Sequence, residues 1–321
     1  MKVAAFIAGD KNIIRSSLVV FASLQQYERN VDCFLFLSDL DIQNVDKEEL
    51  KHHNITIEKL PKNNLFTKSL SWPKEVFLNY FVPNVLCKKC YDICLKLDHD
   101  ILVVGKLDIE KNRPKNEIFS LIEHNYEKLS NSILDDYDFY KEEFNIGSFD
   151  KKSIMFGNVI IDLKKYVEID FWNKYKDAFK KIITKSPSKN ADTFFADMGL
   201  FAIVLEKYKI KYQKMDEKYN TVASHRHLKD KNKIETDLRL IHYAGPKKPW
   251  GKNIFKFITN PYYFLLRQYW IDYVSENTNL NKKLEYVKQQ NTLKSLMFRL
   301  VHSKLYLGYV KLFLKVKGNY N

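Results

Sequence analysis

The fold is decided by residues 2–37, which read KVAAFIAGDKNIIRSSLVVFASLQQYERNVDCFLFL. Residues 2–8 are rich in Val, Ala, Ile and Phe and lead into the polar loop of residues 9–12, which predicts a strand and its end. Residues 13–27 carry apolar side chains at helical spacing, and residues 31–37 form a second apolar strand. A strand, a helix and a strand in this order predict a parallel sheet with crossover helices.

The same alternation continues along the chain. Strands are expected at residues 55–60, 91–97, 101–104, 156–163 and 238–243, and helices at residues 45–52, 75–86, 171–183 and 193–208. Residues 110–152 are polar and predict irregular structure, and strand patterns stop at about residue 254. We therefore expect an α/β catalytic domain over residues 1–253 and a helical, basic extension over residues 254–321.

Composition narrows the class of protein. The chain has 321 residues, 45% of them hydrophobic, which is typical of a globular protein. It contains no apolar stretch of the roughly 18 residues that a membrane span needs, and its first residues lack a secretory pattern, so a cytosolic protein is expected. The net charge of +14 is compatible with a nucleic acid, an anionic membrane or a phosphorylated substrate as partner.

The expected strand of residues 91–97 leads directly into Asp98-His99-Asp100. Because side chains alternate along an extended backbone, both carboxylates would point to one side. Together they could bind one hard divalent cation, Mg²⁺ or Mn²⁺, which in turn would neutralise a diphosphate. The alternative interpretation is an acidic pair in a solvated loop.

Two further segments carry candidate ligands. His242 ends an expected strand and could bind a metal, while Gly245 and a following lysine could approach a phosphate. The alternative is a core histidine followed by a Gly-Pro turn with solvated lysines. The loop of residues 9–12 could hold a base and ribose, although it lacks the dinucleotide-binding glycines and could equally be a plain turn.

Taken together, these segments resemble the GT-A nucleotide-sugar glycosyltransferases of glycosyltransferase family 8 over residues 3–250. Residues 95–103 resemble the family signature LYLDxDILV, residues 242–250 resemble HxxGPxKPW, residues 8–12 are similar to AADDN, residues 156–163 resemble FNAGVLLIDL, and residues 218–220 resemble KYN. The family is retaining, so a transfer that keeps the α configuration of the donor sugar is implied.

The resemblance implies a Mn²⁺ or Mg²⁺ cofactor and a UDP-sugar donor, UDP-galactose or UDP-glucose. Asp98, Asp100 and His242 would bind the cation, with Asp98 also near the nucleotide; Ala8, Gly9, Asp10 and Asn12 would surround the uridine; Gly245 and Lys248 would contact the diphosphate. Lys248 would also assist catalysis, because a cation at the diphosphate stabilises the departing UDP.

The chain departs from the family pattern in places that concern the sugars. Gly157-Asn158 stands where the family has Asn-x-Gly, and the family's DQD motif has no clean copy. Asp197 and Asp192 are both candidates for the carboxylate that orients the donor sugar. The donor and the acceptor therefore remain open, and a protein that binds a nucleotide sugar without transferring it is an alternative.

Positive charge is concentrated at the C-terminal end of the sequence. Residues 282–321 contain nine basic residues and one acidic residue, Glu285, so they carry +8 of the net +14. Apolar and aromatic side chains at helical spacing between these charges predict an interfacial membrane helix, the alternative being a helix packed on the catalytic domain.

This distribution favours an anionic membrane over nucleic acid as the partner, although a basic nucleic-acid-binding protein remains an alternative. We expect a cytoplasmic protein, peripheral on the inner face of the cytoplasmic membrane. The expected acceptor is a lipooligosaccharide, capsular or other cell-surface glycan.

Overall fold

The computed structural model describes residues 1–40, 44–62, 73–125, 142–145, 152–185, 197–222, 238–245, 248–250, 270 and 273–274. The chain divides into two compact units, one of Met1–Thr221 with Asp230–His242 and one of Val222–Lys229 with Tyr243–Asn321. The expected domain boundary between residues 253 and 254 lies outside the described residues and remains a prediction. The first unit holds nearly all of the described helices and strands.

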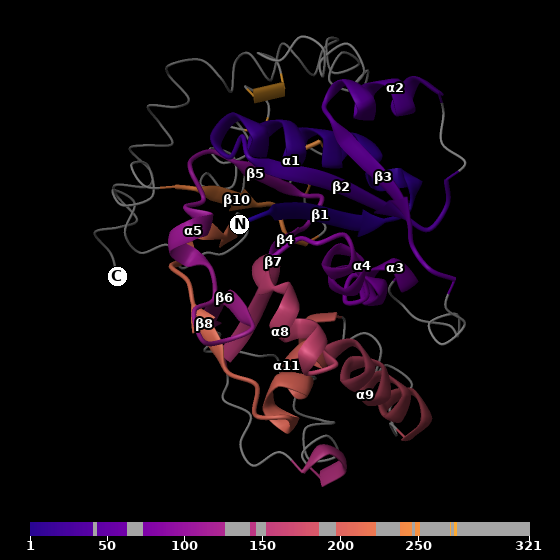
Figure 1. Cartoon of the computed structure of the whole chain (residues 1–321), viewed down its shortest axis with the longest axis vertical. Coiled ribbons are helices and arrows are strands. Elements are labelled where there is room, and N and C mark those ends of the chain that lie inside the picture. The colour runs from indigo at the N-terminus through magenta and orange to yellow at the C-terminus, as the bar shows by residue number, and fades with distance from the viewer. Residues whose placement is uncertain are drawn as a thin grey trace, which may run out of the picture. The chain divides into compact units, whose positions relative to one another are not determined.

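A seven-stranded sheet forms the centre of the first unit, with strand order β3-β2-β1-β4-β7-β6-β8 (Figure 1). Its strands are β1 (Val3–Gly9), β2 (Val31–Leu37), β3 (Ile55–Lys59), β4 (Ile93–Leu97), β6 (Phe119–Asn125), β7 (Lys152–Asp162) and β8 (Tyr212–Lys214). The first four strands pair in parallel, whereas β7 is antiparallel to both β4 and β6. The expected α/β fold is confirmed.

The parallel half of the sheet follows the predicted pattern. Phe6 in β1 is opposite Phe34 in β2 and Lys96 in β4. Asp10 follows β1 and caps the short 3-10 helix η1 (Lys11–Ile13), which leads into α1 (Ile14–Tyr27). Since β1 and β4 are parallel neighbours, the loops that follow them lie at the same edge of the sheet.

The other half differs from the prediction, because β6 and β8 are strands where none was expected. Strand β6 contains the buried polar residues Ser120 and Glu123, which hide the apolar pattern of a strand. The Glu123 carboxylate accepts hydrogen bonds from two residues of the neighbouring strand β8, the Tyr212 hydroxyl and the Lys214 ammonium. The polar residues of β6 therefore obscured its strand pattern, whereas β7 overlaps the strand expected at residues 156–163.

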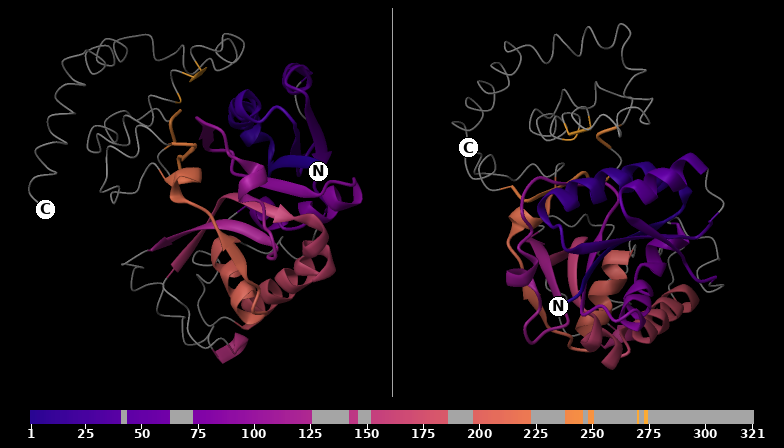
Figure 2. Two further views of the ribbon diagram at one scale, coloured as in Figure 1. Left: turned by 60° about the vertical axis from the view of Figure 1, so that its left-hand side comes forward. Right: turned by 45° about the horizontal axis from the view of Figure 1, so that its top comes forward.

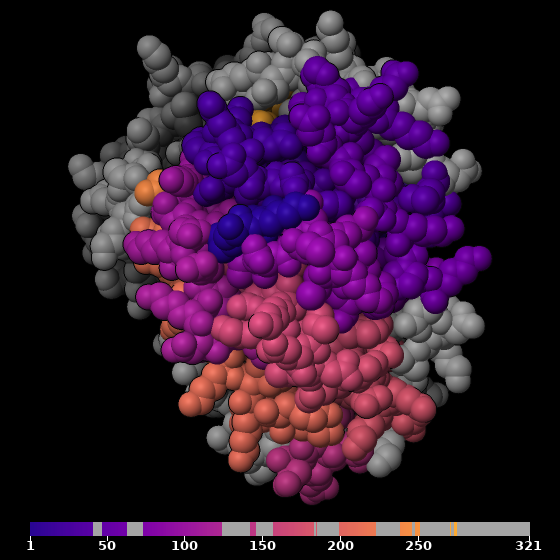
Figure 3. All heavy atoms as spheres, viewed as in Figure 1, coloured from indigo at the N-terminus to yellow at the C-terminus, as the bar shows by residue number. Residues whose placement is uncertain are grey.

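The helices lie on both faces of the sheet. Figures 1 and 2 show α1 on one face together with α2 (Asn44–His52). On the other face lie α3 (Lys74–Leu78), α4 (Val82–Lys88), α8 (Leu163–Glu168), α9 (Phe171–Lys185) and α11 (Asp197–Lys207), while the short α5 (Ile109–Asn112) precedes β6. In the space-filling view, β1 and its neighbours and the later helices form one continuous surface (Figure 3).

The single helix expected over residues 75–86 is two helices. Pro83 lies in the first turn of α4, where its missing N–H is tolerated, but it cannot continue the hydrogen-bond ladder of α3. The Val82 N–H instead bonds to the Asn79 carbonyl at 3.3 Å. The proline therefore separates the two helices.

Aromatic side chains dominate the core between the sheet and the α8–α11 face. Tyr80 stacks on Tyr175 with ring centroids 3.9 Å apart, and Phe119 of β6 meets the Phe171 and Phe201 rings edge-on at 5.0 Å. The contacts of Phe119 pack α9 and α11 against β6.

A smaller sheet has the strand order β5-β10-β9, with β5 (Ile101–Val103), β10 (Leu240–His242) and β9 (Thr221–Val222). Of the expected extension over residues 254–321, the structure describes Trp270, Tyr273 and Val274, and Trp270 packs against Trp250 with centroids 5.6 Å apart. Residues 282–321 lie outside the described residues. None of the helices in the described ranges is long and apolar enough to cross a membrane.

Candidate metal centre

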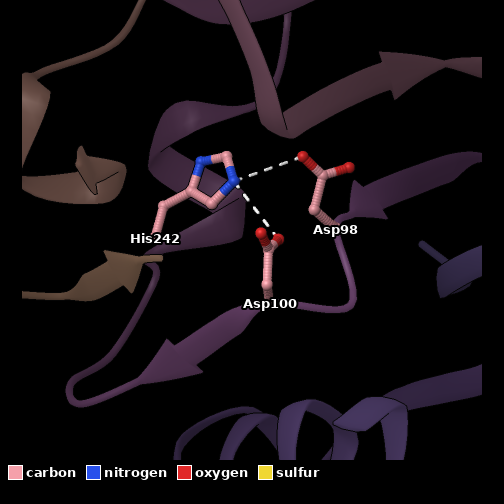
Figure 4. Close-up of side chains that lie close together, drawn as sticks. All are labelled: Asp98, Asp100 and His242. Carbon is pink, nitrogen blue, oxygen red and sulfur yellow. Dashed lines mark ion pairs between the residues drawn. The ribbon is translucent and has the colours of Figure 1, made fainter. Parts of the chain in front are cut away.

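Asp98, Asp100 and His242 converge at one point of the first unit (Figure 4). His242 Nε2 lies 3.4 Å from Asp98 Oδ2 and 3.3 Å from Asp100 Oδ1. One potential ligand atom from each residue lies within 4.8 Å of the others. In the part of the chain that the structure describes, they form the only group of three or more His, Cys, Asp or Glu side chains that could hold a metal ion.

Strand pairing brings these distant residues together. Strands β5 and β10 are antiparallel, and His242 lies opposite Ile101, the residue directly after Asp100. The convergence was predicted from the family resemblance, but the extended conformation expected for Asp98–Asp100 was wrong. The two carboxylates meet because residues 98–100 leave β4 and enter a turn, and not because side chains alternate along an extended strand. The Asp98 N–H donates a hydrogen bond to the Gly157 carbonyl at 3.0 Å, which fixes the start of this turn.

The donor set suits a divalent cation. The side chains of Asp100 and His242 are 7% and 5% exposed, while that of Asp98 is 32% exposed, so the cluster is mostly buried and open on the Asp98 side. Two adjacent carboxylates with little access to water are unfavourable unless positive charge neutralises them, and the Lys96 ammonium that pairs with Asp98 supplies one positive charge against their two negative charges. Two carboxylate oxygens and one imidazole nitrogen are ligands that Mn²⁺ accepts, and Mg²⁺ is also bound by carboxylates.

Asn220 orients the imidazole of His242. Its Oδ1 lies 3.1 Å from His242 Nδ1, and its side chain is completely buried. When Nδ1 carries the proton and donates to Asn220, the lone pair of Nε2 points at Asp98 and Asp100, as a metal ligand requires. The preceding Tyr219 anchors this segment by donating its hydroxyl to Asp108, and burial raises the pKa of that phenol.

Gly157 leaves room for the same ring. A Cβ at this position would lie 2.4 Å from His242 Nδ1, so any larger residue would displace the imidazole. The neighbouring Asn158 is also buried and donates its amide to the Tyr219 carbonyl at 2.8 Å. The Gly157-Asn158 pair therefore shapes the surroundings of His242 from β7.

The loop expected to hold a nucleotide lies at the same edge of the sheet as the carboxylates. Ala8 and Gly9 end β1, next to the end of β4. Asp10 accepts hydrogen bonds from both the backbone N–H and the side-chain amide of Asn12, each at 2.9 Å. At the start of α1 the Ser16 hydroxyl lies 3.0 Å from Nδ1 of His99, which links this loop region to the Asp98–Asp100 turn.

Residues 5–254 match the model of the glycosyl transferase family 8. The chain belongs to glycosyltransferase family 8. A comparison with curated protein sequences found no match.

Solved structures of glycosyltransferases share the fold. The chain is similar to an active-site mutant of LgtC, with a TM-score of 0.56, 13% identity, and coverage of 86% of this chain and 96% of LgtC. It is similar to GlyE of Streptococcus pneumoniae, with a TM-score of 0.53, 17% identity, and coverage of 87% of this chain and 63% of GlyE. It is also similar to the bifunctional WbbM, with a TM-score of 0.54, 14% identity and coverage of 81% of this chain. The match spans about half, 49%, of the length of WbbM.

The structure describes only some of the other residues that are expected from the family pattern. Gly245 has a positive φ of 87°, a conformation that favours glycine, and Lys248 donates to the Tyr243 carbonyl at 3.2 Å; all three residues belong to the second unit. Asp197 is the first residue of α11, where the structure does not describe its side chain, and Asp192 lies outside the described residues. Their roles in this family 8 chain remain predictions.

Several polar contacts of the site were not predicted from the sequence. Lys96, in the otherwise apolar strand β4, is buried with its ammonium paired to Asp98, and neither Asn220 nor Ser16 was assigned a role. A lysine inside the run ICLKL was a visible signal, because a buried lysine needs a nearby negative charge. Asn220 belongs to the segment that resembles the family motif KYN, but nothing indicated its contact with His242, which is 22 residues away in sequence.

Proposed function

We propose that the chain is a metal-dependent, retaining hexosyltransferase that takes galactose or glucose from a UDP-sugar. The observation that carries this proposal is the convergence of Asp98, Asp100 and His242 beside the loop that follows β1. Ligands of parallel α/β sheets bind at the carboxyl ends of the strands, which is where these residues lie. Membership of glycosyltransferase family 8 supports the same assignment.

In this proposal, Asp98, Asp100 and His242 hold Mn²⁺ or Mg²⁺. When bound, the cation supplies charge neutralisation for the diphosphate of the donor. Ala8, Gly9, Asp10 and Asn12 surround the uridine. Both oxygens of Asp10 already accept from Asn12, but a carboxylate has further lone pairs, so the loop can be rigid and still bind a base.

The departing nucleotide is stabilised by residues that follow His242 in sequence. Gly245 lets the backbone approach the diphosphate, and the ammonium of Lys248 neutralises part of the negative charge of the diphosphate. Asp197 or Asp192 orients the donor sugar. The proposed electrostatic stabilisation acts on the leaving group, where negative charge grows during the transfer.

Hydrolysis of a panel of UDP-sugars, with and without Mn²⁺, tests the proposal. We expect turnover of UDP-galactose or UDP-glucose that depends on the cation, and its loss in Asp100→Asn with the fold retained. Full activity in that variant would refute the assignment. Binding of UDP-sugars without any turnover would favour the alternative of a nucleotide-sugar-binding protein that transfers nothing.

The acceptor and the location form a separate part of the proposal. We place the protein in the cytoplasm, peripheral on the inner face of the membrane, where residues 282–321 would bind anionic lipid and the acceptor would be a lipooligosaccharide, capsular or other cell-surface glycan. Each lysine near an anionic surface contributes about 1 kcal/mol. No nucleic acid is proposed as partner.

Sedimentation with anionic liposomes tests the membrane association. Removal of residues 282–321 should release the protein from the liposomes while donor hydrolysis continues. Unchanged liposome binding would refute the role of this segment, and salt-dependent binding to duplex DNA or RNA without any effect of UDP would favour a nucleic-acid-binding protein.

A further inference from the structure

Lys96 places a positive charge directly against the candidate metal site. All five residues of β4 are buried, and Lys96 is only 2% exposed although it carries an ammonium. Its Nζ pairs with Oδ1 of Asp98. The second oxygen of that carboxylate, Oδ2, faces His242 Nε2 at 3.4 Å. The two oxygens of Asp98 are therefore divided between an internal cation and the metal site.

This division changes the charge that a metal ion meets. Asp98 and Asp100 supply two negative charges, and Lys96 cancels one of them. A divalent cation bound there would be left with an excess of positive charge, and the ammonium would repel it through a medium of low dielectric constant. A diphosphate carries the negative charge that is missing. The cation and the diphosphate would therefore each favour the binding of the other.

We propose that Lys96 is an internal counter-cation that weakens the binding of a divalent cation by the Asp98, Asp100 and His242 site until a nucleoside diphosphate is present. Lys96 acts through Asp98 and is a positioning residue. The role of the nucleoside diphosphate rests on the proposed function; the effect of Lys96 on the cation alone does not. The cation and the donor would therefore bind together, and the protein without the donor would bind the metal weakly.

The test measures the Mn²⁺ dissociation constant of the full chain by electron paramagnetic resonance of the free ion, with and without UDP. Lys96→Met keeps an apolar stem of similar length and removes the charge. We expect this variant to bind Mn²⁺ alone on the order of 10-fold more tightly than the wild type, and UDP to improve that affinity less. Unchanged or weaker binding of Mn²⁺ alone would overturn the proposal.

Three further variants separate charge from structure. Lys96→Arg keeps the positive charge and should keep the wild-type Mn²⁺ affinity. Lys214→Met removes another lysine–carboxylate pair, with Glu123 at 2.9 Å, from β8 at the end of the sheet, and should leave Mn²⁺ binding unchanged. Lys96→Gln replaces Lys96→Met if circular dichroism shows that methionine disturbs the fold. Tighter Mn²⁺ binding in Lys214→Met would overturn the charge argument.

The outcomes distinguish this inference from the proposed function. If Lys96→Met binds Mn²⁺ more tightly but the wild type turns over no UDP-sugar, the inference stands and the proposed function fails. If the wild type turns over UDP-sugars while both proteins bind Mn²⁺ equally, the proposed function stands and the inference fails. If neither protein binds Mn²⁺, both fail.

Discussion

The two halves of the large sheet contribute to the site in different ways. The β3-β2-β1-β4 half is parallel and built from apolar runs, and its loops carry the Asp98–Asp100 turn and the loop of residues 9–12. The β7-β6-β8 half mixes strand directions and buries polar residues such as Ser120 and Asn158. From this second half, Gly157 packs against His242. One half therefore supplies two potential ligands, and the other shapes the surroundings of the third.

The largest expected effect tests whether the β6–β7 half is a structural support. Phe119→Ala in β6 removes a buried ring that contacts Phe171 and Phe201, and should lower the free energy of unfolding by about 3–5 kcal/mol. Chemical denaturation followed by circular dichroism measures this loss. The folded fraction should still bind Mn²⁺ with wild-type affinity, and a parallel loss of affinity would show that the two halves are not separable.

A second prediction addresses the turn after β4. Asp100→Asn removes a charged ligand from a buried site, so Mn²⁺ binding and donor hydrolysis should both fall by more than the roughly 100-fold that loss of a supporting residue causes. Isothermal titration with Mn²⁺ measures the binding. Asp162→Asn, at the cap of α8, is the matched control: it should cost about 1 kcal/mol of stability at most and leave Mn²⁺ binding intact. Wild-type Mn²⁺ affinity in Asp100→Asn would exclude this carboxylate as a ligand.

Gly157→Ala tests the support from β7 more directly. The new Cβ would lie 2.4 Å from His242 Nδ1, so the imidazole must shift from its present position beside the two carboxylates. We expect Mn²⁺ affinity to fall by about 10- to 100-fold with a small change in melting temperature. Unchanged Mn²⁺ affinity would mean that His242 can shift without leaving the site, and that the two halves are less coupled than the geometry implies.

The smallest expected effect comes from Asn220. Asn220→Ala removes the hydrogen bond to His242 Nδ1 and should weaken Mn²⁺ binding by about 10-fold. Asn220→Asp keeps an acceptor at the same place and should retain most of the affinity. Equal affinities in both variants would show that Asn220 fills space and does not orient the ring.

Much of the fold and of the site could be predicted from sequence. The parallel half followed from apolar runs separated by helical spacing, and residues 93–97 and 31–37 form strands within two residues of their expected bounds. Asp98, Asp100 and His242 were singled out because they lie at the ends of expected strands, and the family resemblance combined them into one site. Strands β6 and β8 did not, because Glu123 is a polar residue whose partners, Tyr212 and Lys214, are about 90 residues away in sequence.

The sequence by itself determined which chemical groups the site contains and which segments form the parallel strands, because burial patterns and strand ends are properties of neighbouring residues. Only the tertiary structure decided how those groups meet. The register of β5 with β10 places His242 beside a turn more than 140 residues earlier in the sequence. The packing of Gly157, Asn220 and Lys96 around that point likewise depends on contacts between distant segments, which no local pattern specifies.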